Sequence, residues 1–215
     1  QSIGSLTGVL GAEVLLGSQT LTSNSSTATT YAGVLTGTGG LTLTGSGTLT
    51  LAGANPYSGT TTIANGTIVL DADGSIVNSN VDIAAPGVLD ITAANQSIGS
   101  LTGVSGAQVL LGAHTLTSNT TATTTYAGVL TGTGGLTLTG SGTLTLAGAN
   151  PYSGATTISD GTLILGSSGS IAQSDVIIGS PGVFDITAGN QSIGSLAGAS
   201  GAQVLLGSHS LVSNS

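Results

Sequence analysis

Apolar and polar residues alternate along short stretches of the chain. The alternation is clearest in Leu41–Thr44 and Thr48–Leu51, on either side of the turn-forming Gly45–Gly47. A period of two is typical of a strand that buries one face. Further short strands are expected at Val14–Leu16, Thr60–Ile63, Thr67–Leu70, Val81–Ile83 and Val88–Ile91. No window carries the apolar stripe of a helix, so the pattern predicts an all-β chain.

The same pattern returns after 95 residues. Gln1–Leu6 recurs as Gln96–Leu101 and as Gln191–Leu196, and 71 of the 95 positions of residues 1–95 are identical in 96–190. We therefore divide the chain into repeat unit 1 (1–95), repeat unit 2 (96–190) and the start of unit 3 (191–215). Two complete units followed by a partial one suggest a segment of a longer polypeptide.

Near-identical units without a linker between them favour a β-solenoid, in which each coil stacks on the one before. Strand runs return about every 20–28 residues, which predicts four or five coils per repeat. With coils ~4.8 Å apart, the chain would form a rod roughly 45–55 Å long, with leucines inside and threonines outside. The alternative is a string of independent sandwich domains, one per repeat.

Composition excludes several classes of protein. Charged residues make up 4% of the chain, all eight are acidic, and Lys, Arg, Cys, Met and Trp are absent. Nucleic-acid binding and docking to an anionic membrane both need cations. Disulfides and cysteine-based zinc sites need cysteine. No apolar run approaches the ~18–20 residues of a membrane span, so direct membrane insertion is not expected. The mean hydropathy of +0.47 argues against disorder.

One segment of each unit carries a specific motif. Gly39–Asn55 reads GGLTLTGSGTLTLAGAN and leads into Pro56–Ile63 and then Gly66–Leu70. It resembles the passenger-associated repeat of bacterial autotransporters, commonly GGLTKTGxGTLTLxGxNTYxGxTxIxxGxL. Gln1–Leu6 and Tyr31–Gly37 are similar to spacers found beside that repeat. The resemblance implies a right-handed parallel β-helix exported to the surface of a Gram-negative cell.

The motif departs from that family at two places. Leu43 and Leu138 stand where the family usually has lysine, and Pro56 and Pro151 stand where it usually has threonine. The first change removes a cation and adds apolar surface. We expect Leu43 to be buried or to meet a neighbouring molecule.

Candidate catalytic residues are few. Asp82 and Asp90 are the obvious carboxylate pair for glycoside hydrolysis, but unit 2 has Ile177 and Asp185 at these positions. A Ser/His/Asp arrangement would need His114 or His209, yet unit 1 has Gln19 there. We expect Asp90 to face solvent or a turn and both histidines to be surface residues.

Candidate binding residues are equally sparse. Asp71–Gly74 is similar to the opening of a calcium loop, but unit 2 has Gly166–Gly169 there, and Glu13 is the only glutamate. Asn24–Ser26 and Asn119–Thr121 fit the N-glycosylation pattern. The sequence thus predicts no catalytic, cofactor-binding or metal-binding residue, and no cofactor.

These observations favour a non-enzymatic extracellular protein, a rigid stalk or filament segment on the bacterial surface. The runner-up is an adhesin whose solenoid walls mediate cell–cell, biofilm or host attachment by binding glycans or other copies of the chain. A carbohydrate-active enzyme is a third hypothesis. Unpaired edges of the end coils and uncharged walls suggest self-association end to end or side by side.

Overall fold

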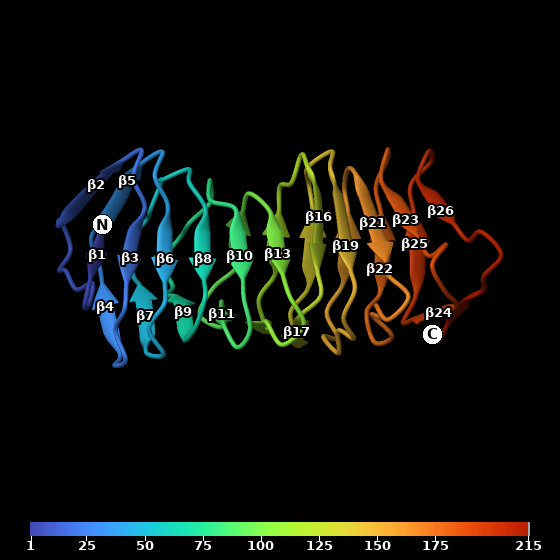
Figure 1. Ribbon diagram of the computed structural model, residues 1–215. Helices are drawn as coiled ribbons and strands as arrows, with labels where there is room; N and C mark the ends of the chain where they lie inside the picture. Colours follow the sequence, from blue (N-terminus) through green and yellow to red (C-terminus); the bar gives the residue numbers. More distant parts are fainter. Residues whose placement is uncertain (215) are drawn as a thin grey trace.

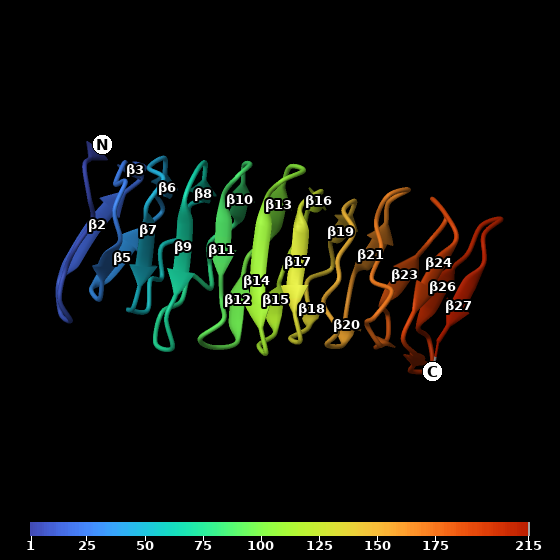
Figure 2. The same cartoon turned by 90° about the horizontal axis from the view of Figure 1, so that it is seen from below.

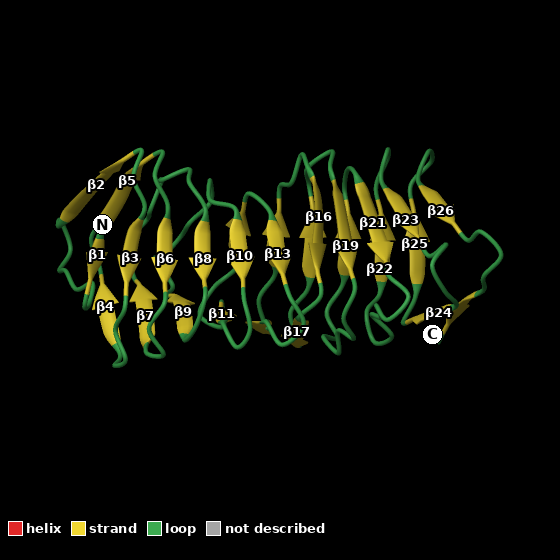
Figure 3. Ribbon diagram, in the orientation of Figure 1, coloured by secondary structure: helices red, strands yellow, loops and turns green. Residues whose placement is uncertain are grey.

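The computed structural model describes residues 1–214 as one elongated column of parallel strands (Figure 1). All residues described fall in strands, turns or loops, and none in a helix (Figure 3). The first coils lie at one end and the chain advances steadily toward the other, as the view from below also shows (Figure 2). No described helix is therefore long and apolar enough to cross a membrane.

The column has three faces, which the chain visits in a fixed order. Face 1 is an eleven-stranded sheet: β1 (Ser2–Ile3), β3 (Leu21–Ser23), β6 (Leu41–Leu43), β8 (Thr61–Ile63), β10 (Val81–Ile83), β13 (Leu101–Gly103), β16 (Thr123–Tyr126), β19 (Thr143–Leu146), β21 (Thr162–Leu165), β23 (Val183–Asp185) and β26 (Gln203–Leu205). Eleven strands on one face correspond to about eleven coils.

Faces 2 and 3 are built the same way but are interrupted. Face 2 holds β4 (Thr29–Tyr31), β7 (Thr48–Leu51), β9 (Thr67–Leu70), β11 (Val88–Asp90), β14 (Gln108–Gly112), β17 (Val129–Gly132), β24 (Gln191–Ile193) and β27 (Leu211–Ser213). Face 3 holds β2 (Glu13–Gly17), β5 (Val34–Gly37), β12 (Gln96–Ile98), β15 (Leu116–Ser118), β18 (Leu136–Leu138), β20 (Thr156–Ile158), β22 (Val176–Ile178) and β25 (Leu196–Gly198). Single bridges replace strands on face 2 at Gly8, Ala149 and Ser170, and on face 3 at Ala54 and Ser75.

Every strand pair is parallel, and most partners are 20 residues apart. Ser2, Thr22, Thr42, Thr62, Asp82 and Thr102 form one row across face 1. The ladder crosses from unit 1 to unit 2 without a gap, because β10 pairs with β13 and β11 with β14. The predicted parallel β-solenoid is confirmed, and separate sandwich domains are not formed.

The alternation of the sequence places leucines inside and threonines outside. Leu41 and Leu43 are buried on either side of the half-exposed Thr42, and Leu49 and Leu51 flank Thr50 in the same way. Leu43, which stands at the family's lysine position, is only 1% exposed and packs in the core. Some inward positions are polar, notably Thr61 and its counterpart Thr156.

All the strands expected from alternation are present, with ends that differ by one or two residues. The strands that sequence reasoning missed are short, such as β3 (Leu21–Ser23) and β4 (Thr29–Tyr31). Three residues carry too little alternation to be recognised alone. Their inter-coil hydrogen bonds define them, and these are invisible in the sequence.

The 95-residue repeat does not contain a whole number of coils. Unit 1 has eleven strands, β1 to β11, and three bridged segments at Gly8, Ala54 and Ser75, which together make fourteen segments on three faces. Fourteen segments are four and two-thirds coils. Each unit is therefore turned by one face relative to the last: β6 lies on face 1, whereas its counterpart β18 lies on face 3.

Candidate functional site

The most distinctive surface feature is a groove where a sheet is interrupted. On face 2 of unit 2, the strands stop after β17 and resume at β24, with only the Ala149–Ser170 bridge between them. A cavity of about 280 Å³ lies there, lined by Val129, Ala149, Asn150, Pro151, Ser170, Ala172 and Gln173. Pro151 has no N–H to donate to a ladder, which is one reason why no strand forms there.

Buried side-chain amides replace the missing backbone partners beside the groove. The Leu130 N–H donates to Asn150 Oδ1 over 2.9 Å, and Asn150 Nδ2 donates to the Gly148 carbonyl over 2.6 Å. On the far side of the gap, Gln191 Nε2 donates to the Gly169 carbonyl over 2.9 Å. The amides satisfy backbone groups that would otherwise be buried without partners.

Unit 1 has the same interruption on face 3. Asn55 Oδ1 accepts from the Leu35 N–H over 2.9 Å, and Gln96 Nε2 donates to the Gly74 carbonyl over 2.8 Å. Because of the rotation between units, the two interruptions open on different faces of the column. Sequence reasoning read Asn55–Pro56 as a turn and did not assign the Asn55 amide to the interior.

A hydrogen-bonded chain of hydroxyls lies buried near each interruption. Tyr152 Oη and Thr156 Oγ1 are 2.6 Å apart, Thr156 Oγ1 and Ser174 Oγ are 2.7 Å apart, and Ser174 Oγ donates to the Gly154 carbonyl. Burial raises the pKa of Tyr152 to about 12, and the matching Tyr57 of unit 1 also has its pKa raised to about 12 by burial. These hydroxyls are neutral structural groups at physiological pH.

The other two tyrosines also face inward. Burial raises the pKa of Tyr126, and burial together with the nearby Glu13 carboxylate raises the pKa of Tyr31. Tyr31 Oη donates to the Val34 carbonyl over 3.2 Å. No tyrosine in residues 1–214 is therefore displayed on the walls as a flat stacking surface for a sugar.

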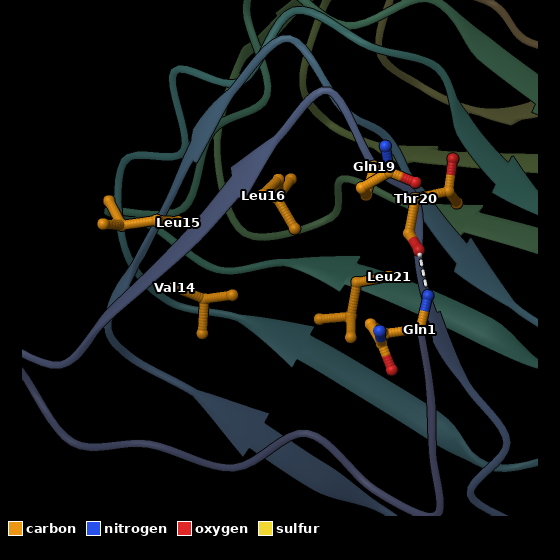
Figure 4. Close-up of a pocket in the computed structure, with 7 residues that line it drawn as sticks. All are labelled: Gln1, Val14, Leu15, Leu16, Gln19, Thr20 and Leu21. Carbon is orange, nitrogen blue, oxygen red and sulfur yellow. Dashed lines mark hydrogen bonds between the residues drawn. The ribbon is translucent and has the colours of Figure 1, made fainter.

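A second, smaller hollow lies at the first coil. Its volume is about 110 Å³, and Val14, Leu15, Leu16 and Leu21 supply most of its lining (Figure 4). The Gln1 amino group donates to the Thr20 carbonyl over 2.9 Å at its rim. Leu15 is 75% exposed, so this hollow is the open end of the hydrophobic core.

The carboxylates considered for glycoside hydrolysis lie on different faces. Asp82 is exposed on face 1, where it accepts from Thr102 Oγ1 over 2.9 Å. Asp90 lies on face 2 and accepts from the Thr92 N–H over 2.8 Å, as Asp185 does from Thr187. As expected, Asp90 and Asp185 cap turns.

The remaining candidates are surface residues. His114 and His209 are half-exposed, each in a turn in which its N–H donates to a carbonyl three residues earlier. Asp71 and Asp73 are exposed in a turn whose Asp71 Oδ1 accepts from the Ala72 N–H. Asn24 and Asn119 are exposed, as a glycosylation acceptor must be. Within residues 1–214, no three His, Asp, Glu or Cys side chains gather as metal ligands.

The walls between these features are uncharged over long distances. In unit 2 the outward row on face 3 runs through Ser97, Thr117, Thr137, Thr157, Ile177 and Ala197. It has hydroxyls at one end and apolar side chains at the other. Such rows can offer hydroxyl and methyl groups to a neutral partner.

Fold and surface together define a class: a repeat-built, three-faced parallel β-solenoid with neutral hydroxyl-rich walls. The passenger-associated-transport-repeat family matches residues 41–70 and 136–165, so the chain contains one such repeat in each complete unit. The matched segments run from β6 to β9 and from β18 to β21. Comparisons with curated proteins and with solved structures returned no match.

Proposed function

We propose that this chain is a non-enzymatic stalk segment, which holds another part of an autotransporter passenger away from the bacterial cell surface. The observation that carries the proposal is the uninterrupted face 1, on which eleven strands pair in order from β1 to β26. A sheet shared by both repeats leaves no hinge between them, and a stalk needs this rigidity. The transport repeats support an extracellular location.

Composition fits the same role. The chain has no lysine or arginine, so trypsin-like proteases have no cleavage site and no side-chain salt bridge contributes to stability. Stability therefore comes from the continuous core and the inter-coil ladders. Both are insensitive to the salt concentration outside a cell.

Deletion of one whole unit tests the stalk role. Removal of residues 96–190 from the full-length passenger joins Asn95 to Gln191 and recreates the Asn95–Gln96 junction. We expect a folded rod shorter by about 22 Å, from four and two-thirds coils at ~4.8 Å each. Electron microscopy measures the length, and a cell-attachment assay measures function. A stalk loses reach but keeps the affinity of whatever it carries.

The groove between β17 and β24 favours a second candidate function, adhesion through the walls. Its lining is uncharged and mixes amide and hydroxyl groups with small apolar ones, which suits a neutral glycan better than a charged one. In that case the deletion would lower binding to glycan arrays in proportion to the number of units. A binding signal unchanged by the deletion would exclude the wall as the adhesive surface.

Side-by-side association of columns is a further part of this proposal, because the outward rows carry few charges that would repel a second copy. Analytical ultracentrifugation over a range of concentrations tests it. Thr137→Asp, at an outward position of β18, should weaken lateral association without unfolding the column.

A further inference from the structure

The turn between β8 and β9 contains the only Asn-Gly pair of the sequence, Asn65–Gly66. The Gly66 N–H donates to Asn65 Oδ1 over 2.8 Å. The side-chain carbonyl of Asn65 thus lies directly against the backbone nitrogen of the next residue. Both residues are only half-buried, so water reaches the turn.

The Gly66 nitrogen is not held by the inter-coil ladder. The residues on either side are held: Asn65 N donates to the Leu43 carbonyl and Thr67 N to the Gly47 carbonyl. Among residues 1–214, Asn65 Oδ1 is the only acceptor that the Gly66 N–H has. Gly66 also has a φ of +69° and no Cβ, so no side chain shields its nitrogen.

We propose that Asn65 is a site of spontaneous deamidation in the folded protein. The Gly66 nitrogen loses its proton to water and attacks Asn65 Cγ, the Cγ–Nδ2 bond breaks, and ammonia leaves. The product is a five-membered succinimide ring. Water then adds to one of the two ring carbonyls and opens the ring to aspartate or isoaspartate. One water is consumed and one ammonia released, with no oxidation or reduction.

Unit 2 has the aspartate product at the same position. Asp160–Gly161 replaces Asn65–Gly66, Asp160 Oδ1 accepts from the Gly161 N–H over 2.7 Å, and Gly161 has a φ of +70°. The turn therefore accommodates the carboxylate without rearrangement. Deamidation to aspartate would make the turn of unit 1 chemically equivalent to that of unit 2 and add one negative charge to the column.

Asn80 provides a built-in contrast. It also exchanges with an aspartate between units, since Asp175 is its counterpart. However, the next residue is Val81, whose N–H donates to the Ser100 carbonyl over 2.8 Å within the ladder. Its nitrogen is both engaged and shielded by a branched side chain, so Asn80 should remain intact while Asn65 reacts.

The test uses the folded chain, incubated at neutral pH below its melting temperature. Peptic peptides are then analysed by mass spectrometry for the small mass gain that follows from exchanging NH₂ for OH. We expect the gain in the peptide that contains Asn65 and not in the one that contains Asn80. Asn65→Gln should abolish it, because a six-membered ring forms far more slowly.

Asp160→Asn is the matched gain-of-function variant, since it places a second Asn-Gly pair in an equivalent turn. Its peptide should acquire the mass gain at a rate comparable to that of Asn65. Circular dichroism before and after incubation confirms that the reaction takes place in folded protein. If Asn65 and the asparagine introduced by Asp160→Asn both stay intact in the folded chain and react only after denaturation, the proposal is wrong.

Discussion

At the scale of single residues, the interior of the column depends on a few polar side chains that replace backbone partners. Asn55 and Asn150 are 1% and 2% exposed, and each bonds two backbone groups of its own and the preceding coil. A strand that breaks off inside a sheet leaves N–H and C=O groups unpaired. The amide side chain satisfies one group of each kind, which explains why asparagine rather than a hydrophobic residue stands there.

Asn55→Ala should therefore destabilise the fold. The Leu35 N–H and the Gly53 carbonyl would lose their side-chain partner inside the column, at a cost of about 2–3 kcal/mol. Urea denaturation followed by circular dichroism measures the change. Asn24→Ala, at an exposed position, is the control and should be close to neutral. Equal stability of the two variants would mean that Asn55 is not buried as described.

The buried tyrosines predict a loss of stability in alkali. An unfolded tyrosine ionises near pH 10, whereas Tyr57 and Tyr152 in the folded protein have pKa values of about 12. Both states are protonated below pH 10, so the stabilisation is complete there. Between pH 10 and about 12 only the unfolded state ionises, and each tyrosine should then remove roughly 3 kcal/mol of stability.

Denaturation curves from pH 8 to pH 12 check this expectation. In the double variant Tyr57→Phe/Tyr152→Phe the alkaline loss should become shallower, with Tyr31 and Tyr126 left to contribute. At neutral pH the variant should lose only about 1 kcal/mol per site, since Thr61 keeps its bond to Ser79. An alkaline loss as steep as in the wild type would contradict the assignment.

At the scale of strands, the alternation of leucine and threonine decides which side chains enter the core. This part of the fold was predictable, because the repeated pattern Leu-Thr-Leu fixes the orientation of each strand without reference to its neighbours. The burial of Leu43 was left open at the sequence level. The neighbouring coils, which the sequence does not show, cover it with Ser23 and Ile63 in register.

Leu43→Lys restores the residue that the related repeats usually carry, and it should be poorly tolerated here. The ammonium group would enter a core without a carboxylate partner, at a cost of several kcal/mol. Thr42→Lys, one residue earlier and facing outward, should change stability by less than about 1 kcal/mol. Thermal melts of the two variants compare them directly. Equal melting temperatures would contradict the inward orientation of Leu43.

Glycines set the distance between coils at the turns. A Cβ on Gly45 would overlap the Ser25 carbonyl oxygen of the coil beneath, whereas a Cβ on Gly189 would meet nothing. Gly45→Ala should consequently cost about 1–3 kcal/mol through displaced backbone, and Gly189→Ala should be nearly neutral. Chemical denaturation of both variants measures the difference. If Gly45→Ala were as stable as Gly189→Ala, the coils would not be packed as closely as described.

At the scale of the whole molecule, the column has two periods that do not match. The 95-residue period is obvious in the sequence because unit 2 repeats unit 1 almost unchanged. The coil period of about 20 residues is hidden, since successive coils such as those of β6 and β8 differ in sequence and share only shape. The groove was unpredictable for the same reason: it depends on which segments stack across it, from Val129 to Gln173.

The mismatch has a consequence for anything displayed on the walls. Three units make a whole number of coils, fourteen, so equivalent side chains return to the same face only after 285 residues, three times the 95-residue repeat. A partner bound by one unit would be joined by partners on the other two faces. A column of this kind presents its surface all around and not along one line.

Site-directed labels can test this rotation, because the chain has no cysteine of its own. Thr22→Cys with Thr102→Cys places two labels in one row of face 1, four coils apart. Thr42→Cys with Thr137→Cys places them at equivalent positions of the two units, on faces 1 and 3. Electron micrographs of biotinylated, streptavidin-bound columns should show the first pair on the same side and the second pair on different sides. Both pairs on the same side would require a whole number of coils per repeat, which the register of β13 with β16 and the order of the three faces contradict.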